Sequence, residues 1–162
     1  MLARLMFAYV DFAARKGLAE TPAPESSDEP SDQISARNRA RRTGVRGETY
    51  AYWYLRRHGY ILVAKNYTRP GLKGELDMVG YDGSVLAFIE VKTRAADLSS
   101  PANPEAAVDA DKRHHLTRMA RNFLRDRHAQ DAPYRFDILA IESRAGSRPE
   151  VRLHKGAFGH DQ

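Results

Sequence analysis

Residues 75–94, ELDMVGYDGSVLAFIEVKTR, decide the fold that this sequence predicts. Two runs rich in apolar residues flank Asp82-Gly83, a dipeptide typical of the turn of a β-hairpin. We therefore expect antiparallel strands over residues 75–81 and 84–93. Glu90 and Lys92 interrupt the second strand, although an unpaired buried charge is costly. The hairpin thus predicts part of a sheet and requires a partner for these two charges.

Segments on either side of the hairpin extend this sheet. Residues 60–67, YILVAKNY, precede it and have the composition of a strand. Residues 134–142 and 150–158 have the same character further along the chain. The sequence therefore predicts five strands.

Apolar residues at helical spacing predict two helices between these strands. The first helix precedes the strand over residues 60–67 and can end at Gly59. The second follows Pro104, a residue that the first turn of a helix tolerates. The residues that form the two stripes are Glu48, Ala51, Tyr52 and Leu55, then Leu116, Met119, Ala120, Phe123 and Leu124. The order α-β-β-β-α-β-β predicts an α/β fold, with a central mixed sheet flanked by helices.

The chain is expected to contain one folded domain after an N-terminal extension. Its 162 residues suffice for a single core. Residues 20–33 hold five acids and three prolines without a large apolar residue, which is typical of a flexible linker. We therefore divide the chain into an extension, residues 1–33, and a domain, residues 34–162, with its core over about residues 44–158.

The net charge of +5 favours an anionic partner such as nucleic acid. Residues 34–46 contain five arginines and no acid, and the predicted second helix begins with further basic residues. A solvated basic surface is the alternative explanation. The candidate phosphate contacts are Arg37, Arg39, Arg41, Arg42, Lys112 and Arg113. Because the chain has no cysteine, a disulfide framework, a thiolate metal site and a cysteine nucleophile are excluded.

The hairpin brings two carboxylates together. If its turn pairs Tyr81 with Ser84, Asp77 lies opposite Phe88 and diagonal to Glu90. Carboxylates this close repel each other unless they share a proton or a cation. The pair therefore predicts a cation between the two strands.

Mg²⁺ or Mn²⁺ would satisfy these acids, since hard cations take carboxylate and carbonyl oxygens together with water. Asp77, Glu90 and the carbonyl of Val91 are the predicted ligands, and Glu48 is a further ligand, direct or through water. Lys92 would stabilise charge that develops on a phosphate. Asp77, Glu90, Lys92 and Glu48 are thus the predicted catalytic residues.

Simpler explanations exist for several of these charges. A cross-strand salt bridge accounts for most Glu-x-Lys pairs in strands. Glu75 is as well explained by a surface role as by metal binding. Asp137 is expected to form a structural pair with Arg135 or a neighbouring basic residue rather than to act in catalysis.

Four segments, GVRGETYAYWYLRRHGYILVAKNY, GELDMVGYDGSVLAFIEVKTR, VDADKRHHL and YRFDILAI, together resemble the UPF0102 (YraN-like) family. This resemblance implies a restriction-endonuclease-like fold, similar to that of archaeal Holliday junction resolvases. It also implies the PD-(D/E)xK nuclease signature, with Asp77 and Glu90 as its acids, Lys92 as its lysine and Glu48 as the acid on the helix. Leu76 replaces the proline of that signature.

The sequence therefore predicts a metal-dependent phosphodiesterase that cleaves DNA, with branched DNA and Holliday junctions among its candidate substrates. A non-catalytic nucleic-acid-binding module on the same fold is the alternative. We further expect a homodimer, since resolvase-like proteins make two symmetric cuts. A cytoplasmic location is expected too, because no run of about 20 apolar residues could cross a bilayer.

Overall fold

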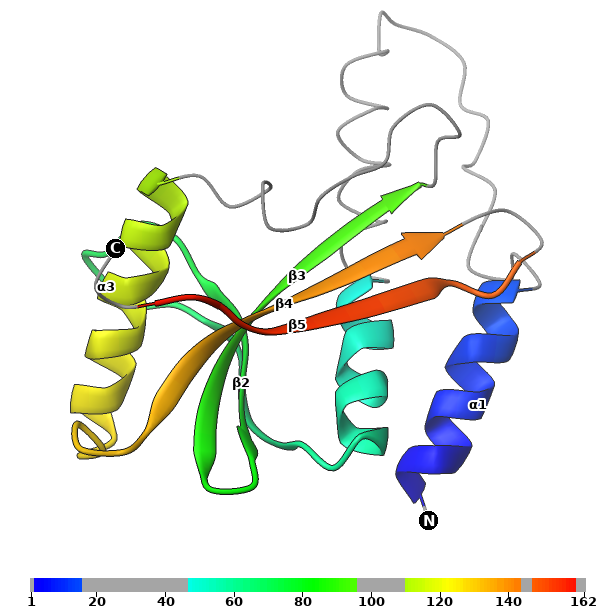
Figure 1. Cartoon of the computed structure of the whole chain (residues 1–162), viewed down its shortest axis with the longest axis horizontal. Helices are drawn as coiled ribbons and strands as arrows, with labels where there is room; N and C mark the ends of the chain where they lie inside the picture. The colour runs from blue at the N-terminus through cyan, green and yellow to red at the C-terminus, as the bar shows by residue number, and fades with distance from the viewer. Residues whose placement is uncertain (1, 16–46, 96–109, 144–146, 160–162) are drawn as a thin grey trace, which may run out of the picture.

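The computed structural model of the chain describes residues 2–15, 47–95, 110–143 and 147–159. Its centre is a twisted five-stranded sheet, whose strands follow the order of the chain (Figure 1). Strands β3 and β4 are parallel, whereas the β1–β2, β2–β3 and β4–β5 pairs are antiparallel. The strands are β1 (Ile61–Tyr67), β2 (Leu76–Asp82), β3 (Val85–Ala95), β4 (Tyr134–Ser143) and β5 (Glu150–Phe158). The predicted mixed sheet and its five strands are confirmed.

Helices cover both faces of this sheet (Figure 1). Helix α3 (Ala110–Asp126) lies between β3 and β4 in the chain, as a parallel strand pair requires, and packs on one face. A helix over residues 47–57 packs on the other face, with α1 (Leu2–Arg15) beside it. The α/β class and the order of the predicted elements are therefore confirmed, with α1 added at the N-terminal end.

The end of the 47–57 helix follows the prediction made from Gly59. Gly59 has a φ of +92°, the left-handed conformation that glycine adopts most easily. The amide of Tyr60 donates to the carbonyl of Leu55, and that of Gly59 donates to Arg56. These two bonds form a Schellman motif, which turns the chain directly into β1.

The β2–β3 hairpin corrects the predicted register by two residues. Asp82 pairs with Val85, so the turn consists of Gly83 and Ser84 rather than Asp82 and Gly83. Gly83 has a φ of +63°, as the first residue of a two-residue Gly-Ser turn requires. The prediction that Asp77 faces Phe88 is therefore wrong, because Val79 occupies that place.

Strand β3 divides its side chains between the two layers of the molecule. Leu86 and Phe88 join the core beneath α3, whereas Ala87 and Ile89 join the core beneath the 47–57 helix. Since side chains alternate along a strand, Glu90 and Lys92 continue the row on the α3 face. The apolar part of β3 thus fixes the face on which these two charges lie.

Helix α1 is attached to the domain through the aromatic ring of Phe7 and the carboxylate of Asp11. The ring of Phe7 packs edge-on against that of Tyr50, with 5.3 Å between their centres. The hydroxyl of Tyr50 donates to Asp11 over 2.8 Å, and Arg15 and Arg148 form ion pairs with the same carboxylate. The first part of the N-terminal extension is therefore a helix packed on the 47–57 helix.

Some predicted features lie outside the described residues. They include the linker over residues 20–33 and the four arginines Arg37, Arg39, Arg41 and Arg42. Within the part of the chain that the structure covers, no helix is both long and apolar enough to span a membrane.

Candidate active site

Asp77 and Glu90 face each other on neighbouring strands. Met78 on β2 pairs with Ile89 on β3. Because the strands are antiparallel, Asp77 and Glu90 occupy the next pair of positions along this ladder. The backbone amide of Val91 donates to Asp77 Oδ2 over 2.7 Å, which ties this carboxylate to β3. The corrected register therefore brings the two acids closer in the ladder than the diagonal arrangement predicted from sequence.

The carboxylate of Glu90 is buried, and only one of its two oxygens has a partner among the described residues. Its side chain is 5% exposed. Its Oε1 forms ion pairs with Lys92 Nζ at 3.0 Å and with Lys112 Nζ at 3.1 Å. Its Oε2 is also buried and has no hydrogen-bond partner among the described residues. Since buried carboxylate oxygens are nearly always bonded, Oε2 lies where a further positive or hydrogen-bonding group is expected.

The carboxyl group of Asp77 has a raised pKa. Its burial, followed by the negative charge of Glu90, raises the pKa of Asp77 to about 7. The hydrogen bond from Val91 and the charge of Lys112 oppose this rise without cancelling it. A divalent cation shared by the two carboxylates would relieve the repulsion that Asp77 experiences from Glu90.

Glu48 approaches from the other side of the sheet. It lies in the first turn of the 47–57 helix, and its Oε2 accepts a hydrogen bond from Asn66 Nδ2 at 3.2 Å, with Lys65 Nζ at 3.6 Å. Gly47 allows the helix to approach β3 closely, because a Cβ at this position would lie 1.8 Å from Thr93 Oγ1. The close approach therefore holds Glu48 near the strand that carries Lys92.

The described residues contain no cluster of three or more histidine, cysteine, aspartate or glutamate side chains arranged to hold a metal ion. Glu48 is thus not brought together with Asp77 and Glu90 into one ligand set. The two-carboxylate pair still suits Mg²⁺ or Mn²⁺, which keep several waters and bind through one or two carboxylates. The unpartnered Glu90 Oε2 and the raised pKa of Asp77 are the features that fit such an ion.

Comparison with known proteins identifies the family. A model described as "Uncharacterised protein family UPF0102" matches residues 47–141, which contain all four predicted catalytic residues. The chain belongs to the UPF0102 family. The UPF0102 protein of Koribacter versatilis (strain Ellin345) is 47% identical over 117 residues, which cover 72% of this chain and 79% of that protein.

Two further UPF0102 relatives match over most of their length. The protein of Solibacter usitatus is 39% identical over 127 residues, covering 78% of this chain and 93% of the relative. That of Symbiobacterium thermophilum is 36% identical over 119 residues, covering 74% and 98% respectively. The resemblance seen in the sequence is confirmed at the level of the family, whose name states no activity.

In the structure of this UPF0102 chain, the other residues considered in the sequence analysis have different surroundings. Glu75 is exposed, and its charge contributes to the raised pKa of Asp77. Arg113 lies over the ring of Phe158, with 5.7 Å between the guanidinium carbon and the ring centre. Lys112 contacts Glu90 and therefore belongs to the site, although the sequence suggested only a phosphate contact.

Asp137 has the structural role that the sequence predicted. It is fully buried, and Arg135 Nε donates to its Oδ1 over 2.8 Å. The amide of Gly156 donates to the same oxygen over 2.9 Å, and the Tyr60 hydroxyl donates to Oδ2 over 3.3 Å. Both oxygens of Asp137 are thus satisfied.

Sequence reasoning missed two neighbours of Glu48. Lys65 and Asn66 lie on β1, and Asn66 has a φ of +51°, a conformation that asparagine tolerates better than most residues. Asn66 also stands between the residues that pair with Met78 and Leu76, which puts it opposite Asp77. Only the asparagine within an otherwise regular strand pattern hinted at this contact.

Proposed function

We propose that this UPF0102 protein is a divalent-metal-dependent phosphodiesterase that hydrolyses DNA. The observation that carries the proposal is the buried Glu90 Oε2, which has no partner in the described structure although it lies beside another carboxylate. A carboxylate needed only for stability would be expected to have both oxygens bonded. One oxygen kept available next to Asp77 instead favours a role in binding an ion.

Asp77 and Glu90 would hold Mg²⁺ or Mn²⁺, with the carbonyl of Val91 as a candidate third ligand. When bound, such an ion polarises a phosphate and makes a neighbouring water more acidic. Lys92 and Lys112 direct two ammonium groups toward Glu90 Oε1. In our proposal these groups offset the charge of the scissile phosphate and keep Glu90 in place.

Glu48 would act on this site through water rather than as a direct ligand. The carboxylate is fixed by Asn66 and Lys65, and the 47–57 helix that carries it packs on the face of the sheet opposite α3. A fixed carboxylate can orient an attacking water or take its proton. This is the role that we propose for Glu48.

A panel of DNA structures tests the proposal. Four-way junction, flap, single-stranded and duplex DNA would be incubated with the protein and Mn²⁺ or Mg²⁺, and the products resolved on denaturing gels. We expect cleavage that is lost with EDTA and falls about a hundredfold or more in Asp77→Asn, Glu90→Gln and Lys92→Ala. If a junction is the substrate, we propose that two copies act together and expect symmetric cuts in opposite strands.

Glu150→Gln is the matched control, since Glu150 is an exposed acid on β5. This variant should cleave like the wild type. Cleavage that persists in Glu90→Gln, or that falls equally in Glu150→Gln, would contradict the assignment. Circular dichroism of each variant would verify that its fold is intact.

A binding module without catalysis is the second candidate. It is favoured by the two lysines on Glu90, since Asp77, Glu90, Lys92 and Lys112 together carry no net formal charge. Such a module would bind nucleic acid without needing an ion. Calorimetry with Mn²⁺ separates the two, because only the phosphodiesterase requires binding that disappears in Glu90→Gln.

A further inference from the structure

The exposed side of α3 carries a row of basic residues that the candidate active site does not use. His114, Arg118, Arg121 and Arg125 follow one another at intervals of four, three and four residues, the spacing of one helical face. All four are exposed, while the opposite face of α3 is buried. This set, the α3 row, extends for about 16 Å at 1.5 Å per residue.

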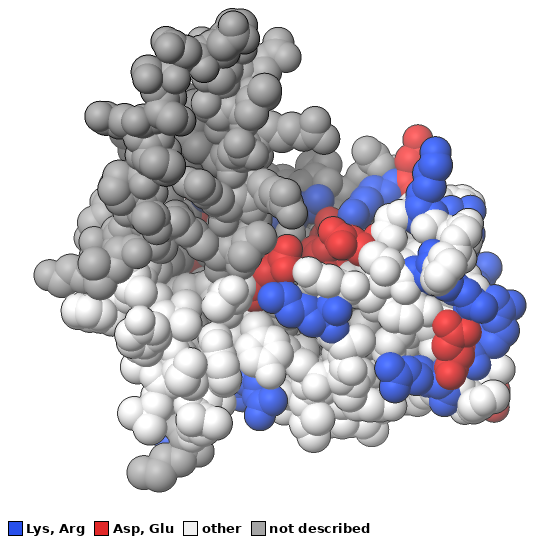
Figure 2. All heavy atoms as spheres, turned by 180° about the vertical axis from the view of Figure 1, so that it is seen from behind, with Lys and Arg blue, Asp and Glu red and all other residues white. Residues whose placement is uncertain are grey.

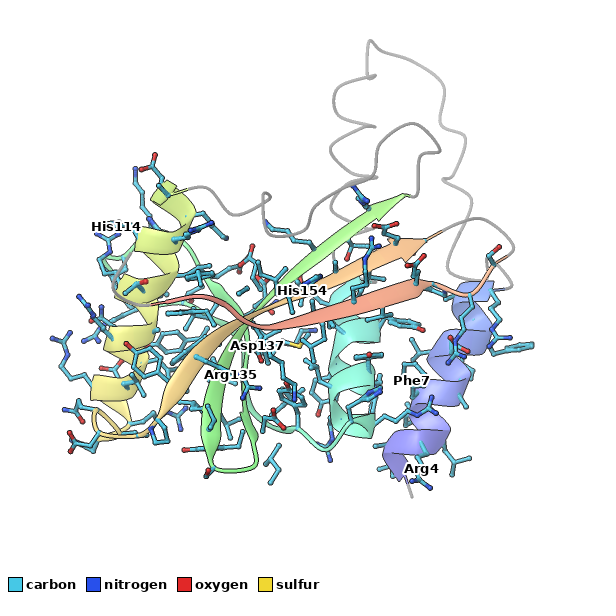
Figure 3. The ribbon with its side chains drawn as sticks, viewed as in Figure 1. Arg4, Phe7, His114, Arg135, Asp137 and His154 are labelled. Atoms are coloured by element: carbon cyan, nitrogen blue, oxygen red, sulfur yellow. The ribbon has the colours of Figure 1, made fainter. Side chains whose placement is uncertain are left out.

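The charge on this part of the helix is of one sign. Residues 112–125 contain five lysines and arginines, two histidines and no acid. Figure 2 shows basic side chains gathered over the end of the molecule that α3 covers, and Figure 3 shows His114 pointing away from the sheet. An open depression lies against the α3 row, and its lining includes all four residues of the row.

Arg118 and Arg121 differ from the third arginine of the row, Arg125, which donates to Asn122. Within the described residues, neither guanidinium forms an ion pair or a hydrogen bond. Six other arginines pair with acids of the domain: Arg15, Arg69, Arg94, Arg135, Arg148 and Arg152. Unlike these six, the arginines in the middle of α3 have no counter-ion in the part of the chain that the structure describes.

The arrangement of the α3 row is unfavourable without a ligand. Arg118 and Arg121 are three residues apart, and Arg121 and Arg125 are four apart, so like charges repel along one face. A line of negative charges along this face would relieve this repulsion.

We infer that the α3 row binds the phosphate backbone of a DNA duplex, without reading its bases. The inference rests on the proposed function for its choice of DNA as the polyanion. Phosphate charges occur about every 1.7 Å along a duplex when both strands are counted, so the row can meet several of them. The same helix holds Lys112 against Glu90 at 3.1 Å, so the α3 row and the Asp77–Glu90 pair belong to the same layer of the molecule.

Binding without metal tests this inference separately from catalysis. Fluorescence anisotropy of a labelled 20-base-pair duplex in EDTA would be measured for the wild type and for Arg118→Gln/Arg121→Gln. Glutamine is a good helix former, so the fold should be retained. We expect the Kd of the double variant to rise about tenfold or more at 0.1 M salt, and the salt slope to fall by about two.

Arg4→Gln/Arg56→Gln is the matched control, because it removes the same charge from exposed arginines on the two helices of the opposite face. Its affinity should stay within twofold of the wild type, and Arg118→Lys/Arg121→Lys should restore most of the loss. The inference is overturned if the wild type does not bind the duplex, if the α3 variant binds as well as the wild type, or if the control loses as much.

The results also distinguish this inference from the proposed function. Loss of duplex affinity in the α3 variant, in a protein that cleaves no DNA with any metal, would support the α3 row and refute the phosphodiesterase. Cleavage by the wild type together with full affinity of the α3 variant would refute the α3 row alone.

Discussion

The two buried acids of the sheet differ in how fully their oxygens are bonded. Asp137 is entirely buried, and each of its oxygens accepts hydrogen bonds. Glu90 is 5% exposed, and its bonds within the described residues reach Oε1 alone. Since burying an unbonded carboxylate oxygen is costly, a fold under selection for stability alone would have no reason to keep one. This contrast separates a structural acid from one that is available to a ligand.

Removing the partner of Asp137 should be strongly destabilising. Arg135→Ala leaves a fully buried carboxylate without its main counter-ion, and it also removes the ion pair with Asp82. We expect the free energy of unfolding to fall by about 3–5 kcal/mol, the usual effect of breaking a buried ion pair. Urea denaturation followed by circular dichroism would measure this change.

Lys155→Ala is the comparison for that variant. Lys155 pairs with Asp82 at 2.7 Å, but its side chain is half exposed. Exposed pairs contribute at most about 1 kcal/mol, so this variant should remain close to the wild type. Equal losses in the two variants would show that burial is not what makes the Arg135 pair important.

At the residue scale, the acidic residues of the candidate site could be predicted from the sequence, but the residues that contact them, Lys112 and Asn66, could not. Glu90 and Lys92 could be recognised because charges interrupt an apolar strand, and alternation along β3 then predicts that they share a face. The contact of Lys112 with Glu90 depends on where α3 begins relative to the sheet. Asn66 reaches Glu48 through a local left-handed conformation. Neither property is contained in a one-dimensional pattern.

At the scale of elements, the sequence pattern predicted the five strands within a few residues of their observed bounds, and it predicted both helices that pack on the sheet. The register of β2 against β3 was wrong because Asp82-Gly83 and Gly83-Ser84 are both plausible two-residue turns. Choosing Gly83-Ser84 shifts every cross-strand pair by two residues without moving any side chain to the other face. The candidate site survived the error for this reason.

The attachment of α1 should weaken in acid. Burial alone raises the pKa of Asp11, but the hydrogen bonds from Tyr50 and Arg15 and the charges of Arg148 and Arg15 outweigh it, so the pKa falls below its ordinary value of 3.8. A carboxylate with a lowered pKa stabilises the folded state fully above its unfolded pKa, and this contribution is lost as the pH falls through the folded pKa. Contacts made by Asp11 should therefore matter at pH 6 and fade below about pH 4.

Asp11→Asn measures this contribution. At pH 6 we expect the free energy of unfolding of the variant to be about 2 kcal/mol lower than that of the wild type. This is the usual contribution of hydrogen bonds to a charged group. The difference should shrink steadily as the pH falls below 4. Thermal melts of both proteins between pH 2.5 and 6 would follow it, and a difference that is constant with pH would contradict an ionised Asp11 as its source.

At the scale of the whole molecule, the two faces of the sheet have different roles in our proposal. The α3 face carries Asp77, Glu90, both lysines of the site and the α3 row. The opposite face is covered by the 47–57 helix and α1, which are held by aromatic packing and by the Asp11 network. The cleavage chemistry that we propose therefore depends on one layer, while the other layer contributes stability and the single carboxylate of Glu48.

Metal binding should stabilise the entire domain, because an ion that binds only the folded state shifts the unfolding equilibrium. At a concentration about 100 times its Kd, Mn²⁺ adds about 2.7 kcal/mol, which corresponds to a rise of about 5–10 °C in Tm for a chain of this size. We expect this rise in the wild type and its reversal by EDTA. Glu90→Gln should show no rise, since Asp77 alone offers a single carboxylate, whereas Glu150→Gln should respond like the wild type. A rise of equal size in Glu90→Gln would mean that the ion binds elsewhere, and the Asp77–Glu90 pair would then lose its proposed role.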